Sequence, residues 1–242
     1  MPTFTEQPLY GGAIQGIVPQ GWIDASTLRE IPDHQELYLS PTTLSSLIIE
    51  VNQFVPNTTA QLTLNSHPSL LPAASQSLPD PDQETLNHAA TIHHLLDICD
   101  PADTLTITSA PRRVSLAKFP GQVAGYIGTA TFTSKVEDAR GRGKEGQGLQ
   151  QRVAGGAGDT AAGAAAAGSS GDGALTTTTL CWFLLVRLVE QETDLLVLVN
   201  VPQKEFEERG DVEGLRQEEA IGEGVVEELV KRLEVKEWEL FA

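Results

Sequence analysis

The stretch TLCWFLLVRLVEQETDLLVLVNV, Thr179 to Val201, is the clearest core segment of the chain. Its first half is apolar on both alternating faces, with Arg187 as the exception, and a second apolar run returns from Leu195 to Val199. Gln191–Asp194 is expected to form the turn between them. A hairpin that is apolar on both faces belongs in the middle of a sheet covered on both sides. It therefore predicts an α+β fold, a three-layer α/β/α sandwich around a central, mostly antiparallel sheet.

Other elements are weaker but recognisable in the sequence. Strands are predicted, from β-branched residues or alternation, at 13–18, 36–39, 47–51, 104–108 and 123–133, with a further strand considered at 61–64. One helix is expected to begin at Asp80, with Pro81 and Gln83 in its first turn, and to run to Cys99. A second is expected over 218–234, where Glu227/Lys231 and Glu228/Arg232 form supporting pairs.

Residues 138–176 interrupt this pattern with a stretch dominated by Gly, Ala, Ser, Arg and Gln. Such a composition buries too little surface to offset its ordering entropy, so it predicts a disordered insert within a single domain of residues 1–242. A GxGxxG match at Gly141–Gly146 falls inside this insert. A dinucleotide site requires that motif between a strand and a helix, so no cofactor is expected.

Charge and cysteine content narrow the class of protein. The 242 residues include 33 Asp and Glu against 16 Lys and Arg, for a net charge of -17. Phosphate backbones and anionic lipid would repel such a chain, so nucleic acid and membranes are excluded as partners and a basic protein surface is favoured. The two cysteines, Cys99 and Cys181, form no metal-binding or disulfide pattern, which suits the nucleus and cytoplasm.

Catalytic and metal-binding motifs are not found. His88, His93 and His94 share the first predicted helix, but their spacing places the rings on different faces. We therefore expect solvated histidines and no metal. Because no recognised nucleophile, base or carboxylate pair is evident, the sequence does not favour an enzyme.

The segment Gly21–Tyr38 gathers carboxylates near one corner. Asp24 or Ser26 can cap a single helical turn, Pro32 and Asp33 favour a turn, and Glu36 is expected to open a strand. Residue patterns alone leave two interpretations open: these carboxylates are solvated surface charges, or they form a binding site for a basic partner.

Two stretches carry a resemblance to a known family, LYGGAI at 9–14 and IDASTLREIPDHQELY at 23–38. They closely resemble the Ran guanine-nucleotide release factor family, with looser similarity at 47–51, 188–202 and 240–242. The resemblance implies a PsbP-like sandwich and binding to the small GTPase Ran, preferably its GTP form, with promotion of nucleotide release during nuclear import. It leaves open whether the main Ran exchange factor is a second partner.

The family's acidic Ran-binding patch matches Asp24, Asp33 and Glu36. With their neighbours, the predicted partner-binding residues are Asp24, Leu28, Arg29, Pro32, Asp33, Gln35 and Glu36. An alternative function is a non-catalytic adaptor or ligand-binding module on the same fold. An enzyme whose site converges only in the folded chain is a third.

Overall fold

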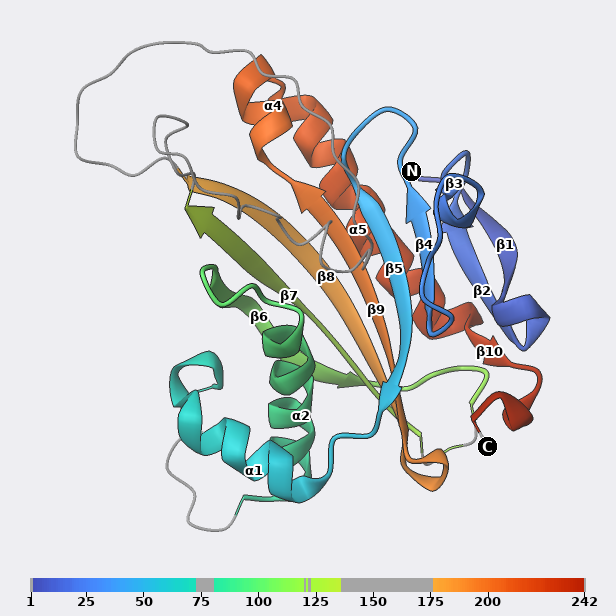
Figure 1. Cartoon of the computed structure of the whole chain (residues 1–242), viewed down its shortest axis with the longest axis vertical. Coiled ribbons are helices and arrows are strands. Elements are labelled where there is room, and N and C mark those ends of the chain that lie inside the picture. Colours follow the sequence, from blue (N-terminus) through green and yellow to red (C-terminus); the bar gives the residue numbers. More distant parts are fainter. Residues whose placement is uncertain (1, 73–80, 120, 122, 136–175, 242) are drawn as a thin grey trace.

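The computed structural model describes residues 2–72, 81–119, 121, 123–135 and 176–241 (Figure 1). The predicted insert and its GxGxxG motif lie outside these residues, except that Thr176 is already the first residue of a strand. Within the described residues, no helix is long and apolar enough to cross a bilayer.

The main sheet has seven strands in the order β3-β4-β5-β9-β8-β7-β6, and every neighbouring pair is antiparallel. In chain order these strands are β3 (Ile23–Asp24), β4 (Gln35–Leu39), β5 (Ser46–Gln53), β6 (Thr104–Val114), β7 (Ala124–Lys135), β8 (Thr176–Leu188) and β9 (Thr193–Pro202). The predicted hairpin, β8 and β9, lies at the centre. The predicted antiparallel centre is therefore confirmed.

The turn of this hairpin lies earlier than predicted. A short 3-10 helix, η5 (Val189–Gln191), is followed by Glu192 in the left-handed region with φ of 47°. Thr193 and Asp194, which were expected in the turn, belong to β9 and are buried. Asp194 can enter the sheet because Arg187, its cross-strand partner, compensates its charge.

One face of the main sheet is covered by two helices, α1 (Asn57–Ser66) and α2 (Gln83–Asp97), joined in part by η3 (Pro68–Leu70). The strand considered at 61–64 is wrong, since these residues are helical. Ala60 and Leu64 bury one face of α1 at helical spacing. The N-cap of α2 is Asp82, whose carboxylate accepts from the Thr85 N–H at 2.8 Å, and not the predicted Asp80.

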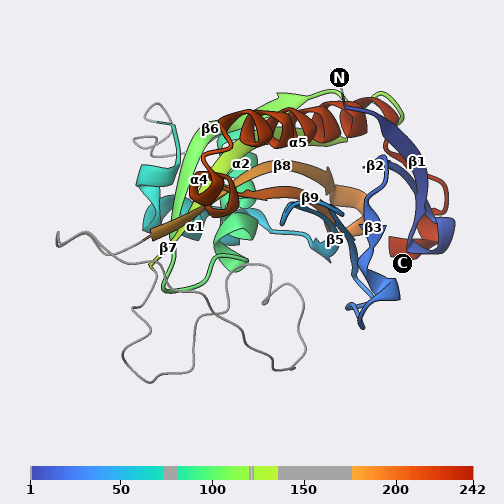
Figure 2. The ribbon, with the colours of Figure 1, turned by 90° about the horizontal axis from the view of Figure 1, so that it is seen from above.

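The opposite face is covered by α5 (Val212–Arg232) and a second sheet, as Figure 2 shows from above. This second sheet, which was not predicted separately, comprises β1 (Phe4–Leu9), β2 (Ile14–Pro19) and β10 (Glu234–Val235) in the order β1-β2-β10. A short helix, α4 (Lys204–Arg209), leads into α5. With helices on both faces of the main sheet, the predicted three-layer arrangement is confirmed.

Helix α5 starts earlier than the predicted Glu218, because Asp211 caps it by accepting from the Gly214 N–H at 2.8 Å. Gly222 lies within this helix for a packing reason. A Cβ atom there would lie 2.5 Å from Cε3 of Trp182 on β8. Near the end of α5, Glu228 pairs with Arg232 as predicted and also with Lys231, the base that was assigned to Glu227.

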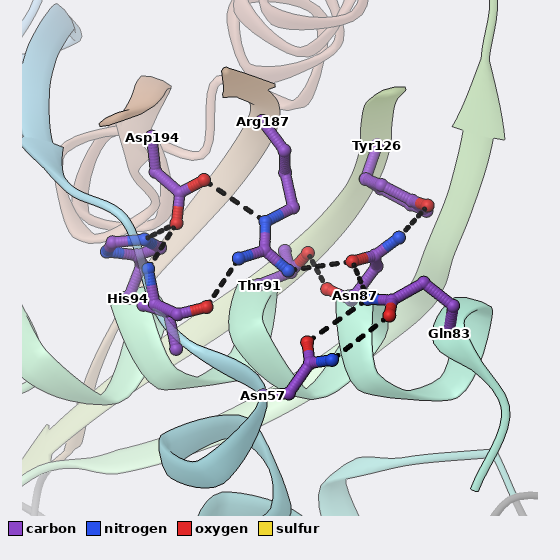
Figure 3. A network of polar contacts seen from close by, with 9 residues as sticks. Asn57, Gln83, Asn87, Thr91, His94, Tyr126, Arg187 and Asp194 are labelled. Carbon is purple, nitrogen blue, oxygen red and sulfur yellow. Dashed lines mark hydrogen bonds and ion pairs between the residues drawn. The ribbon is translucent and has the colours of Figure 1, made fainter. Parts of the chain in front are cut away.

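A buried polar network fastens α2 to the centre of the sheet (Figure 3). The guanidinium of Arg187 donates to Asp194 Oδ1 at 3.1 Å, to Asn87 Oδ1 at 2.7 Å and to the Val55 carbonyl. Asp194 Oδ2 accepts from the Val55 N–H at 2.9 Å. The buried charges are therefore both paired and hydrogen-bonded.

The predicted solvation of the histidines is wrong for His94. Its side chain is buried, and Nε2 lies 2.9 Å from Asp194 Oδ2 in the same network. His88 and His93 are half-buried on α2, and burial lowers the pKa of each. The aspartate that makes burial of His94 favourable lies a hundred residues away in sequence, so helical spacing alone does not reveal it.

Candidate functional site

The acidic segment forms β3, the 3-10 helix η2 (Ala25–Thr27), an irregular loop and a turn into β4. Asp24 is the N-cap of η2, and its Oδ1 accepts from the Ser26 N–H at 2.8 Å. The Gln35 N–H donates to the Pro32 carbonyl at 2.9 Å, which closes the turn that Pro32 and Asp33 predicted. Each of these local features follows from turn and capping chemistry.

The acidic corner consists of Asp24, Asp33 and Glu36. Asp24 is the cross-strand partner of Tyr38, and Glu36 lies two residues before Tyr38 on the same face of β4. Asp33 is exposed in the preceding turn, and within the described residues it has no hydrogen-bond or ion-pair partner. Arg29, the nearby base, is exposed and forms no ion pair with any described residue. The negative charge of the corner is therefore uncompensated within the described chain.

Glu36 differs from a freely solvated carboxylate. Its Oε1 accepts from the Tyr10 backbone N–H at 2.6 Å, and its Oε2 lies 3.5 Å from the Tyr38 hydroxyl. Burial raises the pKa of Glu36, with a further contribution from the negative charge of Asp24, while the N–H of Tyr10 acts in the opposite direction. Burial also raises the pKa of Tyr38, and the two carboxylates add to this effect.

The remaining predicted site residues differ in accessibility. Leu28 is 66% exposed, and Ile23, which was not predicted, is 41% exposed beside Asp24. Pro32 is half-buried at the start of the turn. The Gln35 side chain donates to Glu50, so it lies on the opposite face of β4 from Glu36. The acidic corner therefore has exposed apolar neighbours in Leu28 and Ile23, but Gln35 does not point toward it.

Tyr10 is the contact that residue patterns did not reveal. It lies in η1 (Tyr10–Gly12), the connection between β1 and β2, and reaches the corner although 26 residues separate it from Glu36. The Gly11–Gly12 pair that follows it is a recognisable signal for a turn with positive φ. That signal indicates an unusual connection, but it does not indicate what the connection contacts.

The acidic corner is suited to binding a positively charged surface. Its members are acceptors, and a surface of this kind is complementary to basic side chains on another protein. Among the described residues, no three His, Cys, Asp or Glu side chains lie close enough together to hold a metal ion.

The chain matches a known family model over most of its length. The family model described as Ran-interacting Mog1 protein matches residues 7–202, from the second half of β1 to the end of β9, and this range includes the acidic corner. This chain belongs to the Mog1 family. The resemblance read from 9–14 and 23–38 is thereby confirmed.

Curated relatives match over shorter stretches. A probable Ran guanine nucleotide release factor of Dictyostelium discoideum is 48% identical over 52 residues, which is 22% of this chain and 27% of that protein. The human Ran guanine nucleotide release factor is 52% identical over 44 residues, 18% of this chain and 24% of that protein. The nuclear import protein MOG1 of Saccharomyces cerevisiae is 66% identical over 35 residues, 14% of this chain and 16% of that protein. These alignments span about a quarter of the relatives' length or less.

Solved structures of the family share the fold. The crystal structure of the Ran-binding protein Mog1p of S. cerevisiae aligns with a TM-score of 0.51 and 18% identity, covering 100% of both chains. A Mog1 point variant gives the same TM-score and identity over 99% of this chain and 100% of the other. The mixed α/β fold around a large antiparallel sheet is therefore that of Mog1.

Proposed function

We propose that this protein binds the small GTPase Ran through the acidic corner and promotes release of its guanine nucleotide, preferably from the GTP form. The observation that carries the proposal is the match of the Ran-interacting Mog1 family model to residues 7–202. The release-factor names of the human and Dictyostelium relatives support the same activity. The protein is then a regulator of a GTPase and not itself an enzyme.

The proposed mechanism depends on differential affinity. A GTPase holds its nucleotide through a P-loop lysine and a magnesium ion. The acidic corner pairs with basic residues that otherwise brace the phosphate-binding region, and so favours the open, nucleotide-poor state. The corner needs to bind that state only a few kcal/mol more tightly, since a ligand shifts an equilibrium by its difference in affinity. Leu28, which is 66% exposed, supplies an apolar contact beside the charges.

The cellular role follows from the partner. The yeast relative is named a nuclear import protein, which supports a role for this chain in nuclear protein import and a location in nucleus and cytoplasm. A reconstituted release assay with and without the main Ran exchange factor tests that factor as a second partner.

Asp33→Lys is the sharpest test of the proposed surface. Asp33 is exposed and has no partner among the described residues. We therefore expect the substitution to change the free energy of unfolding of the protein by less than about 0.5 kcal/mol. Opposing a basic partner with like charge costs several kcal/mol, so Ran binding should weaken on the order of a hundredfold. Binding and fluorescent-nucleotide release are measured with purified Ran. Asp24 and Glu36 are poorer probes, because both also accept structural hydrogen bonds.

The matched control is Glu223→Lys. Glu223 is an exposed carboxylate on α5, so this variant makes the same change in net charge away from the corner. It should bind Ran as the wild type does, apart from a small change in long-range attraction. If Asp33→Lys and Glu223→Lys bind equally well, the acidic corner is not the Ran-binding surface. If the wild type does not bind Ran, the adaptor or ligand-binding alternative is favoured.

A further inference from the structure

Tyr10 occupies an unusual backbone conformation next to the acidic corner. Its φ is 50°, in the left-handed region, and it is followed by Gly11 and Gly12 with φ of 66° and 102°. Left-handed conformations are unfavourable for a tyrosine because Cβ approaches the backbone, so contacts elsewhere must hold it there. The hydrogen bonds of Tyr10 show which parts of the chain this conformation holds together.

Tyr10 contacts two groups of the acidic segment, Glu36 and the His34 carbonyl, and one carbonyl of the neighbouring β5, that of Ile49. The backbone N–H donates to Glu36 Oε1 at 2.6 Å, a short bond to a carboxylate. The phenolic hydroxyl lies 2.8 Å from the Ile49 carbonyl and 3.0 Å from the His34 carbonyl, with its one proton shared between them. Burial raises the pKa of this phenol, which keeps it a donor.

Two of the contacted groups belong to residues that closely follow Asp33 in the chain. His34 follows it directly, and Glu36 is the first acidic residue of β4. The His34 carbonyl also accepts from the Val51 N–H at 2.9 Å, so it joins the turn to β5. Tyr10 thus holds both the carboxylate of Glu36 and the backbone beside Asp33.

The loop that carries Tyr10 is itself anchored from the other side. The Ala13 carbonyl accepts from the N–H groups of Lys236 and Glu237 at 2.8 and 3.1 Å. The neighbouring Gln15 and Ile14 pair with β10. A rigid loop can fix the geometry of the groups that it contacts, whereas a mobile one cannot.

We propose that Tyr10 is a positioning residue of the Ran-binding surface, which fixes the turn of Asp33 and the carboxylate of Glu36 in the geometry that the partner recognises. This inference rests on the proposed function. Positioning lowers the ordering cost of binding, so its loss weakens affinity without removing any charge. The effect should therefore fall on the dissociation rate, while charge-steered association is unchanged.

The test compares Tyr10→Phe with Tyr126→Phe. Both variants remove one half-buried or buried hydroxyl and keep the ring, but Tyr126 contacts Asn87 and Glu84 on the α2 side of the sheet. Ran affinity, its salt dependence and the dissociation rate are measured below the melting transition of each variant. Amide hydrogen exchange is measured by NMR on the protein without Ran.

Tyr10→Phe should weaken Ran binding about two- to tenfold through faster dissociation, with the salt dependence of the wild type. The amides of Gln35 and Val51 should exchange faster in this variant, and those of α2 should not. Tyr126→Phe should leave Ran affinity unchanged. Wild-type exchange at Gln35 and Val51 in Tyr10→Phe would overturn the proposal, and so would wild-type Ran affinity in that variant or equal losses of affinity in both variants.

The two proposals fail in different ways. If the wild-type protein does not bind Ran, the proposed function is wrong. Exchange at Gln35 and Val51 then decides by itself whether Tyr10 positions the acidic corner. Unchanged exchange in Tyr10→Phe rejects the positioning role whatever the partner is.

Discussion

At the scale of single residues, Arg187 shows how this fold tolerates charge in its centre. Arg187 is 1% exposed, and its guanidinium donates to Asp194, Asn87 and the Val55 carbonyl and lies 4.0 Å from the ring centroid of Phe54. These partners lie on α2, on β9 and in the connection between β5 and α1, and all three must be in place before the charge is satisfied. The network therefore ties correct folding of α2, β8 and β9 together.

Removing this guanidinium should be costly. Among the described residues, Arg187→Met leaves the buried carboxylate of Asp194 with only His94 and the Val55 N–H as partners, so we expect a loss of about 3–5 kcal/mol in the free energy of unfolding. The control is Arg113→Met. Arg113 is exposed and 4.0 Å from Glu84, so its loss should cost less than about 1 kcal/mol. Urea titration measures both, and equal costs would contradict the importance of the buried pair.

Glu36 should make stability depend on pH. Burial raises its pKa in the folded protein above the ordinary 4.5, so the folded state holds this proton more tightly than the unfolded chain. Stability then falls as pH rises from about 4.5 through the raised pKa. Gln has no proton to lose, and its Oε1 can still accept from Tyr10. Glu36→Gln should therefore have the same stability as the wild type at about pH 4 and should become the more stable protein toward pH 7.

Thermal melts across that range test this prediction. The matched control is Asp33→Asn, which removes an exposed charge without a buried environment. A wild-type advantage over Glu36→Gln that grows with pH would mean that the bond from the Tyr10 N–H, and not burial, dominates the titration of Glu36.

The sequence predicted local roles at this scale and missed long-range ones. The cap by Asp24 and the turn at Pro32 follow from contacts within a few residues. The bond from Tyr10 to Glu36 and the pairing of His94 with Asp194 join residues that are far apart in the chain. No local pattern encodes such contacts, because they exist only after the sheets and helices have packed.

At the scale of elements, the β8–β9 hairpin should be the centre of stability. Leu184 packs on the α5 side of the sheet and Leu196 on the α1 and α2 side, and both are fully buried. Leu184→Ala and Leu196→Ala should each lower the free energy of unfolding by about 2–5 kcal/mol. Leu62→Ala on α1, at a side chain that is 65% exposed, is the control and should be nearly neutral.

Denaturant titration of the three variants checks this expectation. A cost under about 1 kcal/mol for one of the buried leucines would mean that no covering layer buries that face of the main sheet.

The helices and strands that the sequence predicted correctly are those with a clear spacing of apolar residues. The long apolar strands and α2 follow from alternation and from helical spacing, and both are confirmed. The helix α1 was missed because its sequence, NTTAQLTLNS, is rich in threonine and weakly amphipathic, and its packing on α2 determines its conformation. Strand β1 was missed because FTEQPL includes a proline and a glutamate that weaken a strand pattern.

At the scale of the whole molecule, residues 136–175 should be dispensable for folding. Lys135 and Thr176 are direct cross-strand partners at the ends of β7 and β8, so a short Gly/Ser turn can join them without moving either strand. A chain with 136–175 replaced in this way should keep one cooperative thermal transition with a similar midpoint. A large fall in the midpoint would show that these residues contribute to the packed core.

The antiparallel order of the main sheet also determines when the proposed Ran-binding surface, residues 24–36, can form in a cell. Strand β4 pairs with β5, but the other neighbour of β5 is β9, which ends at Pro202. At about 5–20 residues per second, a ribosome needs roughly 7 to 30 s to extend the chain from Gln53 to Pro202. Throughout that time β5 of the nascent chain lacks β9, the strand that pairs with its other edge. A translating ribosome should therefore carry a chain that is unable to capture a partner until β9 has emerged.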